Sequence, residues 1–370
     1  MSTPTQSSSA PPIDHASQGT VMGHPAGLFT LFFAEMWERF SYYGMRALLL
    51  FYMIKGFLSY EDNGAYAVYG AYVGLVYATP FIGGILADKL LGARRAVVFG
   101  GALMAAGHLL MGVENTYSFF IALGLLIVGN GFFKPNISTI VGSLYPEGAP
   151  ERDGGFTLFY MGINLGAAMS PLLCGYIGET FGWHYGFGLA TLGMLIGLAV
   201  FVAPKGVAQG LIGGGAAFSA IALFILPQNV YIFGVMALVG VALLIAAAIS
   251  ITALQRGGIP KEAGLAPNPE KLAEKSIIGL RNDWTVYLGT LLAVPVLALL
   301  VSGNRSIRFI PEETVKSVSE GMGTIGGVVG TFLDELATPA GLVLIIIGGV
   351  ALTILVKSAL TSTSVERDRM

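Results

Sequence analysis

Long apolar segments follow one another along this chain, and they restrict it to folds that a lipid bilayer can hold. Six segments of about 20 residues or more come in quick succession, at 27–54, 65–87, 95–113, 117–145, 156–178 and 185–203. Four more follow, at 211–227, 229–253, 284–302 and 339–357. Inside a bilayer, backbone polar groups must be satisfied within the segment itself. The sequence therefore predicts an all-α membrane protein.

The composition supports a membrane protein and excludes several other classes. The chain is 54% hydrophobic and 11% charged, whereas soluble domains carry about 25% charged residues. A net charge of -2 gives no reason to expect a nucleic-acid partner. The single cysteine, Cys174, excludes a disulfide framework or a cysteine metal site within one chain.

The distribution of lysine and arginine predicts the orientation. Basic residues gather in the loops after the second and sixth spans and in the polar segment 255–283: Lys89, Arg94, Arg95, Lys205, Arg256, Lys261, Lys271, Lys275 and Arg281. Such loops stay in the cytoplasm. We expect a multi-pass protein of the cell membrane with both termini cytoplasmic, residues 1–25 forming a disordered tail, and segment 303–338 outside.

The first span carries four charges that a lipid-facing helix would not tolerate: Glu35, Glu38, Arg39 and Arg46. Each costs roughly 2.5 to 3.5 kcal/mol at the centre of a membrane helix. The eleven Leu, Ile and Phe residues between 28 and 54 return at most about 0.6 kcal/mol each, which does not offset that cost. The charges must pair with one another or face a wet cavity between helices.

Helical periodicity places these charges on one face. Glu35, Glu38, Arg39, Tyr42 and Arg46 fall within an arc of about 100°, and Tyr43 borders it. The i, i+4 spacing of Glu35 and Arg39 allows an ion pair, with Glu38 as a competing partner. Two acids and one close base leave one carboxylate able to take up a proton. We expect a proton-coupling site; the alternative is a structural salt-bridge network.

Three further polar residues are candidates for binding. Lys134 lies near the middle of the fourth span, directly before Pro135, which loosens the helix locally. Asn164 stands among small residues of the fifth span, and Tyr77 offers a hydroxyl from the second. Each has a structural alternative. Lys134 could extend its side chain to the membrane surface, Asn164 could lie in a tight contact between helices, and Tyr77 could serve only for packing. A turn between the second and third spans holds Asp88, Arg94 and Arg95, where an ion pair could form one state of a gate.

Taken together, these motifs resemble those of the proton-dependent oligopeptide transporter family. The chain contains ExxER followed by Tyr-Tyr-Gly-Met-Arg, then GGILAD, FFKPN and FYMGINLG, in order over residues 27–178. The turn GGILADKLLGARR is similar to a hallmark of the major facilitator superfamily, with one extra residue before Gly92. The resemblance implies a major facilitator fold and proton-driven uptake of di- and tripeptides.

The resemblance also implies a role for each candidate residue. Glu35, Glu38 and Arg39 would couple protons to binding. Arg46 and Lys134 would hold the peptide carboxylate, and the remaining candidates, Tyr42, Tyr43, Tyr77 and Asn164, would line the site. No cofactor other than the proton, no metal and no catalytic residue are implied. An enzyme is not expected, since the sequence lacks HExxH, a His pair at ligand spacing and a Walker phosphate loop.

Family members have two six-helix bundles, and this chain departs from that pattern. Residues 26–204 correspond to an amino-terminal bundle. Residues 205–357 are expected to form four accessory helices with polar loops 255–283 and 303–338, and 358–370 a cytoplasmic stub. We expect a fragment or truncated form lacking the second bundle, unable to transport alone because alternating access needs two halves. The alternatives are a carrier of another small anion and a non-transporting membrane binding or scaffold protein.

Overall fold

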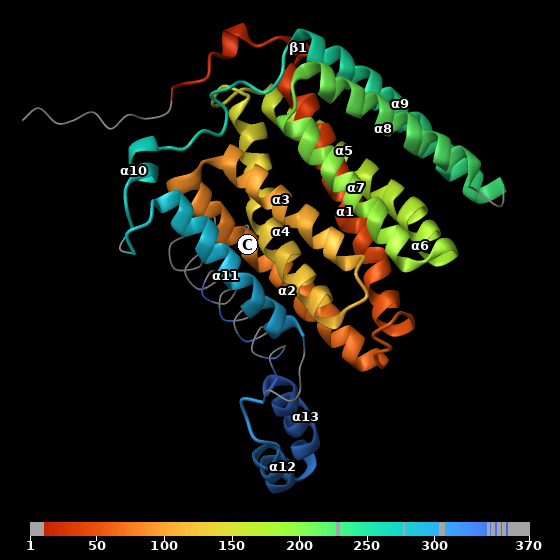
Figure 1. The fold of residues 1–370 in the computed structure, drawn as a ribbon, viewed down its shortest axis with the longest axis vertical. Helices are drawn as coiled ribbons and strands as arrows, with labels where there is room; N and C mark the ends of the chain where they lie inside the picture. Colours follow the sequence, from red (N-terminus) through yellow and green to blue (C-terminus); the bar gives the residue numbers. More distant parts are fainter. Residues whose placement is uncertain are drawn as a thin grey trace, which may run out of the picture.

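The computed structural model describes residues 11–226, 230–276, 278–302 and 308–338, together with Gly341, Ile345, Gly349 and Thr353. Within this part the fold is helical (Figure 1). The first bundle consists of α1 (Ala26–Lys55), α2 (Asp62–Leu86), α3 (Ala93–Met111), α4 (Thr116–Ser143), α5 (Glu151–Ser170), α6 (Tyr176–Phe181) and α7 (Trp183–Val202). Then follow α8 (Lys205–Ile225), α9 (Val230–Arg256), α10 (Pro269–Ala273), α11 (Asn282–Val301), α12 (Glu312–Gly321) and α13 (Gly326–Leu336).

Seven helical stretches in the described residues are long and apolar enough to cross a membrane: Asp62–Leu91, Thr116–Ser143, Glu151–Phe181, Trp183–Val202, Lys205–Ile225, Ile232–Arg256 and Asn282–Val301. The first helix is not among them, since its charges break the apolar pattern. Yet α1 has 30 residues, or about 45 Å at 1.5 Å each, and is long enough to span. The predicted span at 339–357 lies outside the described residues apart from the isolated positions named above.

Two helices organise the bundle. α1 packs against α5 on one side and α7 on another, while α4 packs between α2 and α3. Large side chains of α1 fill the core, and Phe33, Met36, Phe40 and Tyr52 are almost completely buried. Small residues allow α2 and α4 to approach closely, because a Cβ on Gly83 would lie 2.1 Å from the carbonyl oxygen of Gly131.

The later helices flank this bundle on two sides. The α8–α9 hairpin packs on α7, α1 and α5, whereas α11 packs on α4 and α2 (Figure 1). α12 and α13 pack against each other and lie beyond the end of α11 in the same view. The α2–α4 and α1–α5 pairs therefore belong to the core of the bundle, and the later helices are additions to it.

The amino-terminal segment differs from the expected disordered tail. Residues 1–10 lie outside the described part, but His15–Ser17 form a 3-10 turn, and β1 (Thr20–Val21) pairs with β2 (His24–Pro25). A ring nitrogen of His24 lies 2.9 Å from the hydroxyl oxygen of Tyr145, after α4. The guanidinium of Arg256 donates to the carbonyl of Thr20 at 2.9 Å. Contacts with two distant helix ends hold this segment, and its polar composition gave no sign of them.

Candidate functional site

One guanidinium serves two carboxylates in the middle of α1. The Nε atom of Arg39 lies 3.1 Å from Oε1 of Glu35, one helical turn earlier, and it also donates to Oε2 of Glu38. All three residues are at most 2% exposed. The guanidinium carbon of Arg39 also lies 5.2 Å from the ring centroid of Tyr42. The ion pair expected from the i, i+4 spacing is present, and Glu38 joins it.

This cluster is incompletely satisfied. Among the described residues, Oε2 of Glu35, Oε1 of Glu38 and Nη2 of Arg39 have no hydrogen-bond partner. Buried charges normally use all their hydrogen-bonding groups, because an unpaired one retains its desolvation penalty. Two negative charges face one positive charge at the centre, so a proton on either carboxyl group would balance the local charge. Proton binding is therefore a chemistry that this arrangement can perform.

Lys134 brings a second cation to the cluster from α4. Its ammonium interacts electrostatically with both Glu35 and Glu38. It also lies 5.2 Å from the ring centroid of Tyr77, on α2. Lys134 is half-buried and Tyr77 is exposed. The structure thus brings together polar residues of α1, α2 and α4 that the sequence separates by about a hundred positions.

Arg46 lies two helical turns beyond Arg39 and has its own aromatic partner. Its Nε donates to the hydroxyl of Tyr69 on α2 at 2.6 Å, and its guanidinium lies 5.7 Å from that ring. Tyr42 and Tyr43 form an edge-to-face pair with ring centroids 5.2 Å apart. Arg46, Tyr42 and Tyr77 also interact electrostatically. The predicted binding residues of α1 and α2 therefore share one polar region.

Sequence reasoning assigned no role to two residues of this region. Tyr69 was not singled out, although it lies two turns before Tyr77 and so near the same face of α2. Asn130 is 1% exposed, and neither amide atom has a partner among the described residues. It precedes Lys134 by one turn and faces the same way. That i, i+4 spacing was a signal that could have identified it.

Asn164 does not join this group. It is exposed on α5 and lines an apolar cavity of about 600 Å³ between α1, α5 and α9, together with Phe29, Leu238 and Ile245. The neighbouring residues Gly162 and Gly166 point the opposite way, since a Cβ on either would meet α1. The small residues around Asn164 thus make the tight helix contact, and its predicted role in substrate binding stays a prediction.

The turn between α2 and α3 is held differently from the expectation. It comprises the π-helical turn η2 (Ala87–Leu91) and Gly92, whose φ of +78° only glycine adopts readily. The expected pairing of Asp88 with Arg94 or Arg95 is not found among the described residues, and Asp88 is exposed. Arg94 donates instead to the carbonyl oxygen of Pro260 at 2.9 Å.

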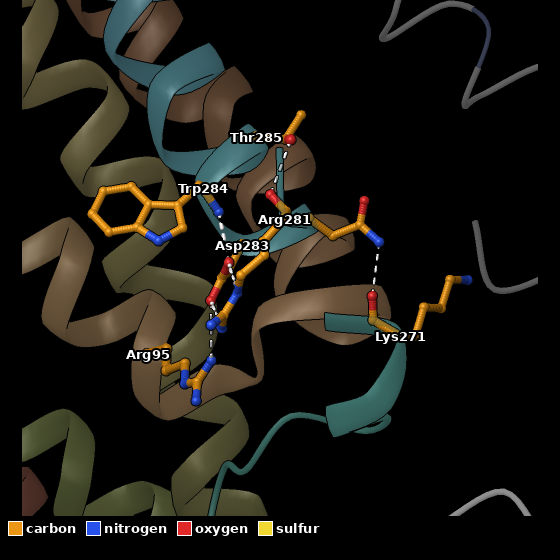
Figure 2. Close-up of polar contacts among 7 residues, drawn as sticks. Arg95, Lys271, Arg281, Asp283, Trp284 and Thr285 are labelled. Carbon is orange, nitrogen blue, oxygen red and sulfur yellow. Dashed lines mark hydrogen bonds and ion pairs between the residues drawn. The ribbon is translucent and has the colours of Figure 1, made fainter. Parts of the chain in front are cut away.

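The acidic partner at this turn comes from the start of α11 (Figure 2). Nη1 of Arg95 lies 4.0 Å from Oδ2 of Asp283, and Arg281 binds the same carboxylate through two nitrogens, at 3.2 and 2.7 Å. Asp283 also accepts a hydrogen bond from the backbone of Trp284. Asp283 follows Arg95 by 188 positions (283 minus 95), so no local pattern indicated this contact. An ion pair between Arg95 and Asp283 therefore connects the turn to α11, one of the helices added to the bundle.

Comparisons with known proteins agree on one family. Residues 94–231 match the POT family. The chain is 46% identical over 189 residues to the peptide transporter YePEPT of Yersinia enterocolitica, covering 49% of this chain and 37% of that protein. It is 43% identical over 194 residues to a di-/tripeptide transporter of Lactococcus lactis, covering 50% and 39%.

A solved structure supports the same assignment. It is the crystal structure of a POT family transporter in complex with 5-aminolevulinic acid, which is 27% identical with a TM-score of 0.57. The match covers 96% of this chain and 58% of the other. The helical membrane fold predicted from the apolar segments is therefore confirmed. The chain spans about two fifths of the length of the curated relatives it matches.

Proposed function

Because the chain belongs to the POT family, we propose that it forms the proton-coupling and carboxylate-binding side of a symporter for di- and tripeptides. The observation that carries the proposal is the shared Arg39, which faces two buried carboxylates while Lys134 acts on both of them. The names of the two peptide transporters among its relatives support the substrate class.

The geometry supports binding of proton and peptide together, because a proton competes with the cations Arg39 and Lys134 for the two carboxylates. With Glu35 and Glu38 both ionised, the attraction of two carboxylates holds Arg39 and Lys134. A proton taken up from water by one carboxyl group removes one negative charge and weakens that attraction. Lys134 is then free to bind the carboxylate of a peptide, which Arg46 can contact through hydrogen bonds of its guanidinium. Release of the peptide restores the attraction and favours loss of the proton.

The site needs an opposite wall. Several large side chains on α2 and α5 are more than half exposed: Tyr77, Phe81, Ile82, Tyr160 and Met161. Tyr77 lies beside Lys134, and large exposed side chains next to a polar site are typical of a protein interface. We infer that a second helical bundle covers this face in the active transporter. This supports pairing with a carboxy-terminal half, as rocking of two bundles requires.

We also propose that the protein lies in the cell membrane with both termini in the cytoplasm. The basic residues Lys89, Arg94, Arg95, Lys205 and Arg256 all lie at the end of the bundle where α1 begins, which supports this orientation. A reporter enzyme fused after residue 370 and active only in the cytoplasm should be active, and an inactive, exported reporter would contradict the orientation.

Binding is the direct test of the proposed function. Purified chain in detergent should bind radiolabelled dialanine and take up protons from an unbuffered solution as it does so. Lys134→Gln should weaken binding about tenfold or more, because a charge-assisted hydrogen bond to the peptide carboxylate is lost. The matched control is Lys55→Gln, at the end of α1 and outside the site. Equal binding by both variants would overturn the proposal.

A second substrate class has support from one observation. The solved relative was crystallised with 5-aminolevulinic acid, a small molecule with an amino group and a carboxylate. Arg46 and Lys134 provide cations for any carboxylate of this size. Competition decides between the two classes. Dipeptides should displace bound dialanine far more effectively than 5-aminolevulinic acid does, and the reverse order would favour a carrier of a small anion.

A further inference from the structure

A separate cavity lies at the end of the bundle where α1, α3 and α8 begin and α7 and α9 end. Its volume is about 340 Å³, within the range of roughly 300 to 1,000 Å³ that small-ligand pockets occupy. Residues of all five helices contribute to its walls. Apolar side chains such as Phe201 and Leu254 line part of it, and three cationic side chains line the rest: Arg94, Lys205 and Arg256. No residue of the proposed peptide site takes part.

Backbone carbonyl groups, rather than carboxylates, hold the three cationic side chains. Each donates to a backbone carbonyl: Arg94 to Pro260 at 2.9 Å, Lys205 to Gln255 at 3.0 Å and Arg256 to Thr20 at 2.9 Å. A carbonyl orients a cation without neutralising it. Among the described residues, no acidic side chain lines the cavity.

Nearby acids do not cancel these charges. Glu262 interacts with Arg94 electrostatically, and it lines an adjoining cavity with Asp14, which Arg256 also borders. Within the described part of the chain, neither Glu262 nor Asp14 forms an ion pair with Arg94, Lys205 or Arg256. The cavity therefore retains an excess of positive charge.

A buried hydroxyl adds a second, independent observation. Thr30 of α1 is 4% exposed and lines this cavity, and its Oγ1 has no hydrogen-bond partner among the described residues. Nε of Arg94 is also buried without one. Buried donors in proteins are normally paired. These two unpaired donors, together with Lys205 and Arg256, form a site suited to an oxyanion with several acceptor atoms, such as a phosphate group.

The position of the cavity relative to the membrane indicates that a phosphate group bound there would belong to a lipid. Three of the candidate spans end at it, with termini at Val202, Lys205 and Arg256. It therefore lies at the level of the lipid headgroups. Exposed apolar side chains, Val202 and Val207, flank it on the side of the hairpin. Basic pockets between helices at this depth favour anionic lipid headgroups.

We propose that this cavity binds the phosphate-bearing headgroup of an anionic phospholipid. The phosphate lies among Arg94, Lys205, Arg256 and the hydroxyl of Thr30, and the acyl chains follow the apolar side chains of α7 and α8. A zwitterionic lipid carries no net negative charge to match the three cations, and a free phosphate ion has no acyl chains to place on the flanking surface.

The test measures lipid binding to the full chain by native mass spectrometry in detergent, with dioleoyl-phosphatidylglycerol and dioleoyl-phosphatidylcholine as probes. Phosphatidylglycerol should bind at least about tenfold more tightly. The double variant Lys205→Gln/Arg256→Gln should lose about 25-fold in affinity for it, at about fivefold per cation. The matched control is Lys271→Gln/Lys275→Gln, which removes two exposed cations from the region of α10 and should bind as the unmodified chain does.

Two further arms separate a built site from general surface charge. Thr30→Val keeps the volume of the side chain but removes its hydroxyl, and it should lower the affinity for phosphatidylglycerol by about tenfold without a change in melting temperature. A large excess of inorganic phosphate should leave the lipid bound. Equal binding of both lipids, equal losses in the two double variants, or displacement of the lipid by phosphate would each overturn the proposal.

Discussion

Arg39 lies 3.1 Å from Glu35 and also donates to Glu38, so one buried guanidinium is divided between two carboxylates of its own helix. A pair of one arginine and one carboxylate would be electrically neutral. The third member leaves the group with one negative charge in excess, which Lys134 moderates from α4. The same three side chains therefore determine both stability and proton exchange. Substituting one of them at a time tests the two properties.

Substitution of Glu35 by glutamine should uncouple proton uptake from peptide binding. The amide keeps the size of the side chain but cannot exchange a proton, while Arg39 retains Glu38. Proton uptake on adding dialanine, followed with a pH electrode, should fall to near zero, and dialanine binding should become nearly independent of pH. The control is Glu61→Gln, an exposed acid before α2. Full proton uptake in Glu35→Gln would remove Glu35 from the coupling role.

Loss of Arg39 should destabilise the protein strongly. Arg39→Gln leaves two buried carboxylates without their countercharge, at a cost of about 3–5 kcal/mol. Adding Glu38→Gln removes one of those charges, so the double variant should be more stable than Arg39→Gln alone. Thermal unfolding of the two variants and of Glu38→Gln gives the coupling energy. Additive losses would show that the three side chains do not act as one unit.

The hydroxyl of Tyr69 should matter for substrate affinity. It accepts the hydrogen bond that orients Arg46, and removing an acceptor from a charged donor costs about 1.5–3 kcal/mol. Tyr69→Phe should weaken dialanine binding about tenfold, measured by equilibrium dialysis. Tyr66→Phe, on the same helix with an exposed ring, should have no effect. Unchanged binding in Tyr69→Phe would separate Arg46 from the peptide carboxylate.

The close contact of α2 and α4 should depend on Gly83. A Cβ there would lie 2.1 Å from the carbonyl oxygen of Gly131, whereas a Cβ on Gly84 would lie 3.7 Å from the nearest atom of Pro135. Gly83→Ala should lower stability by about 1–3 kcal/mol by forcing the helices apart, and Gly84→Ala should be almost neutral. Thermal unfolding of the pair checks this. Similar melting temperatures would show that the helices separate without cost.

The sequence predicted local features well because helix periodicity determines them. The face holding Glu35, Arg39, Tyr42 and Arg46 follows from 100° per residue, and the i, i+4 ion pair needs no knowledge of other helices. Contacts between helices were harder to predict. Which tyrosine meets Arg46 depends on the packing of α1 against α2.

Long-range contacts account for the differences. The ordered segment before α1 is held by Tyr145 and Arg256, which lie far away in sequence. The position of Asn164 depends on which face of α5 packs against α1, and the small residues on both sides of it left that face ambiguous. Family motifs indicated that these residues matter, and packing decides what each one touches.

The turn between α2 and α3 has a mechanical consequence. A Cβ added to Gly92 would lie 2.5 Å from the backbone nitrogen of Ala266. Arg94 donates a hydrogen bond to Pro260 through its side chain and one to Gly264 through its backbone. The connection after α9 thus contacts the turn at several points. A tilt of α2 and α3 would therefore move this connection and, with it, the α8–α9 hairpin. The position of the hairpin would then indicate the conformation of the bundle.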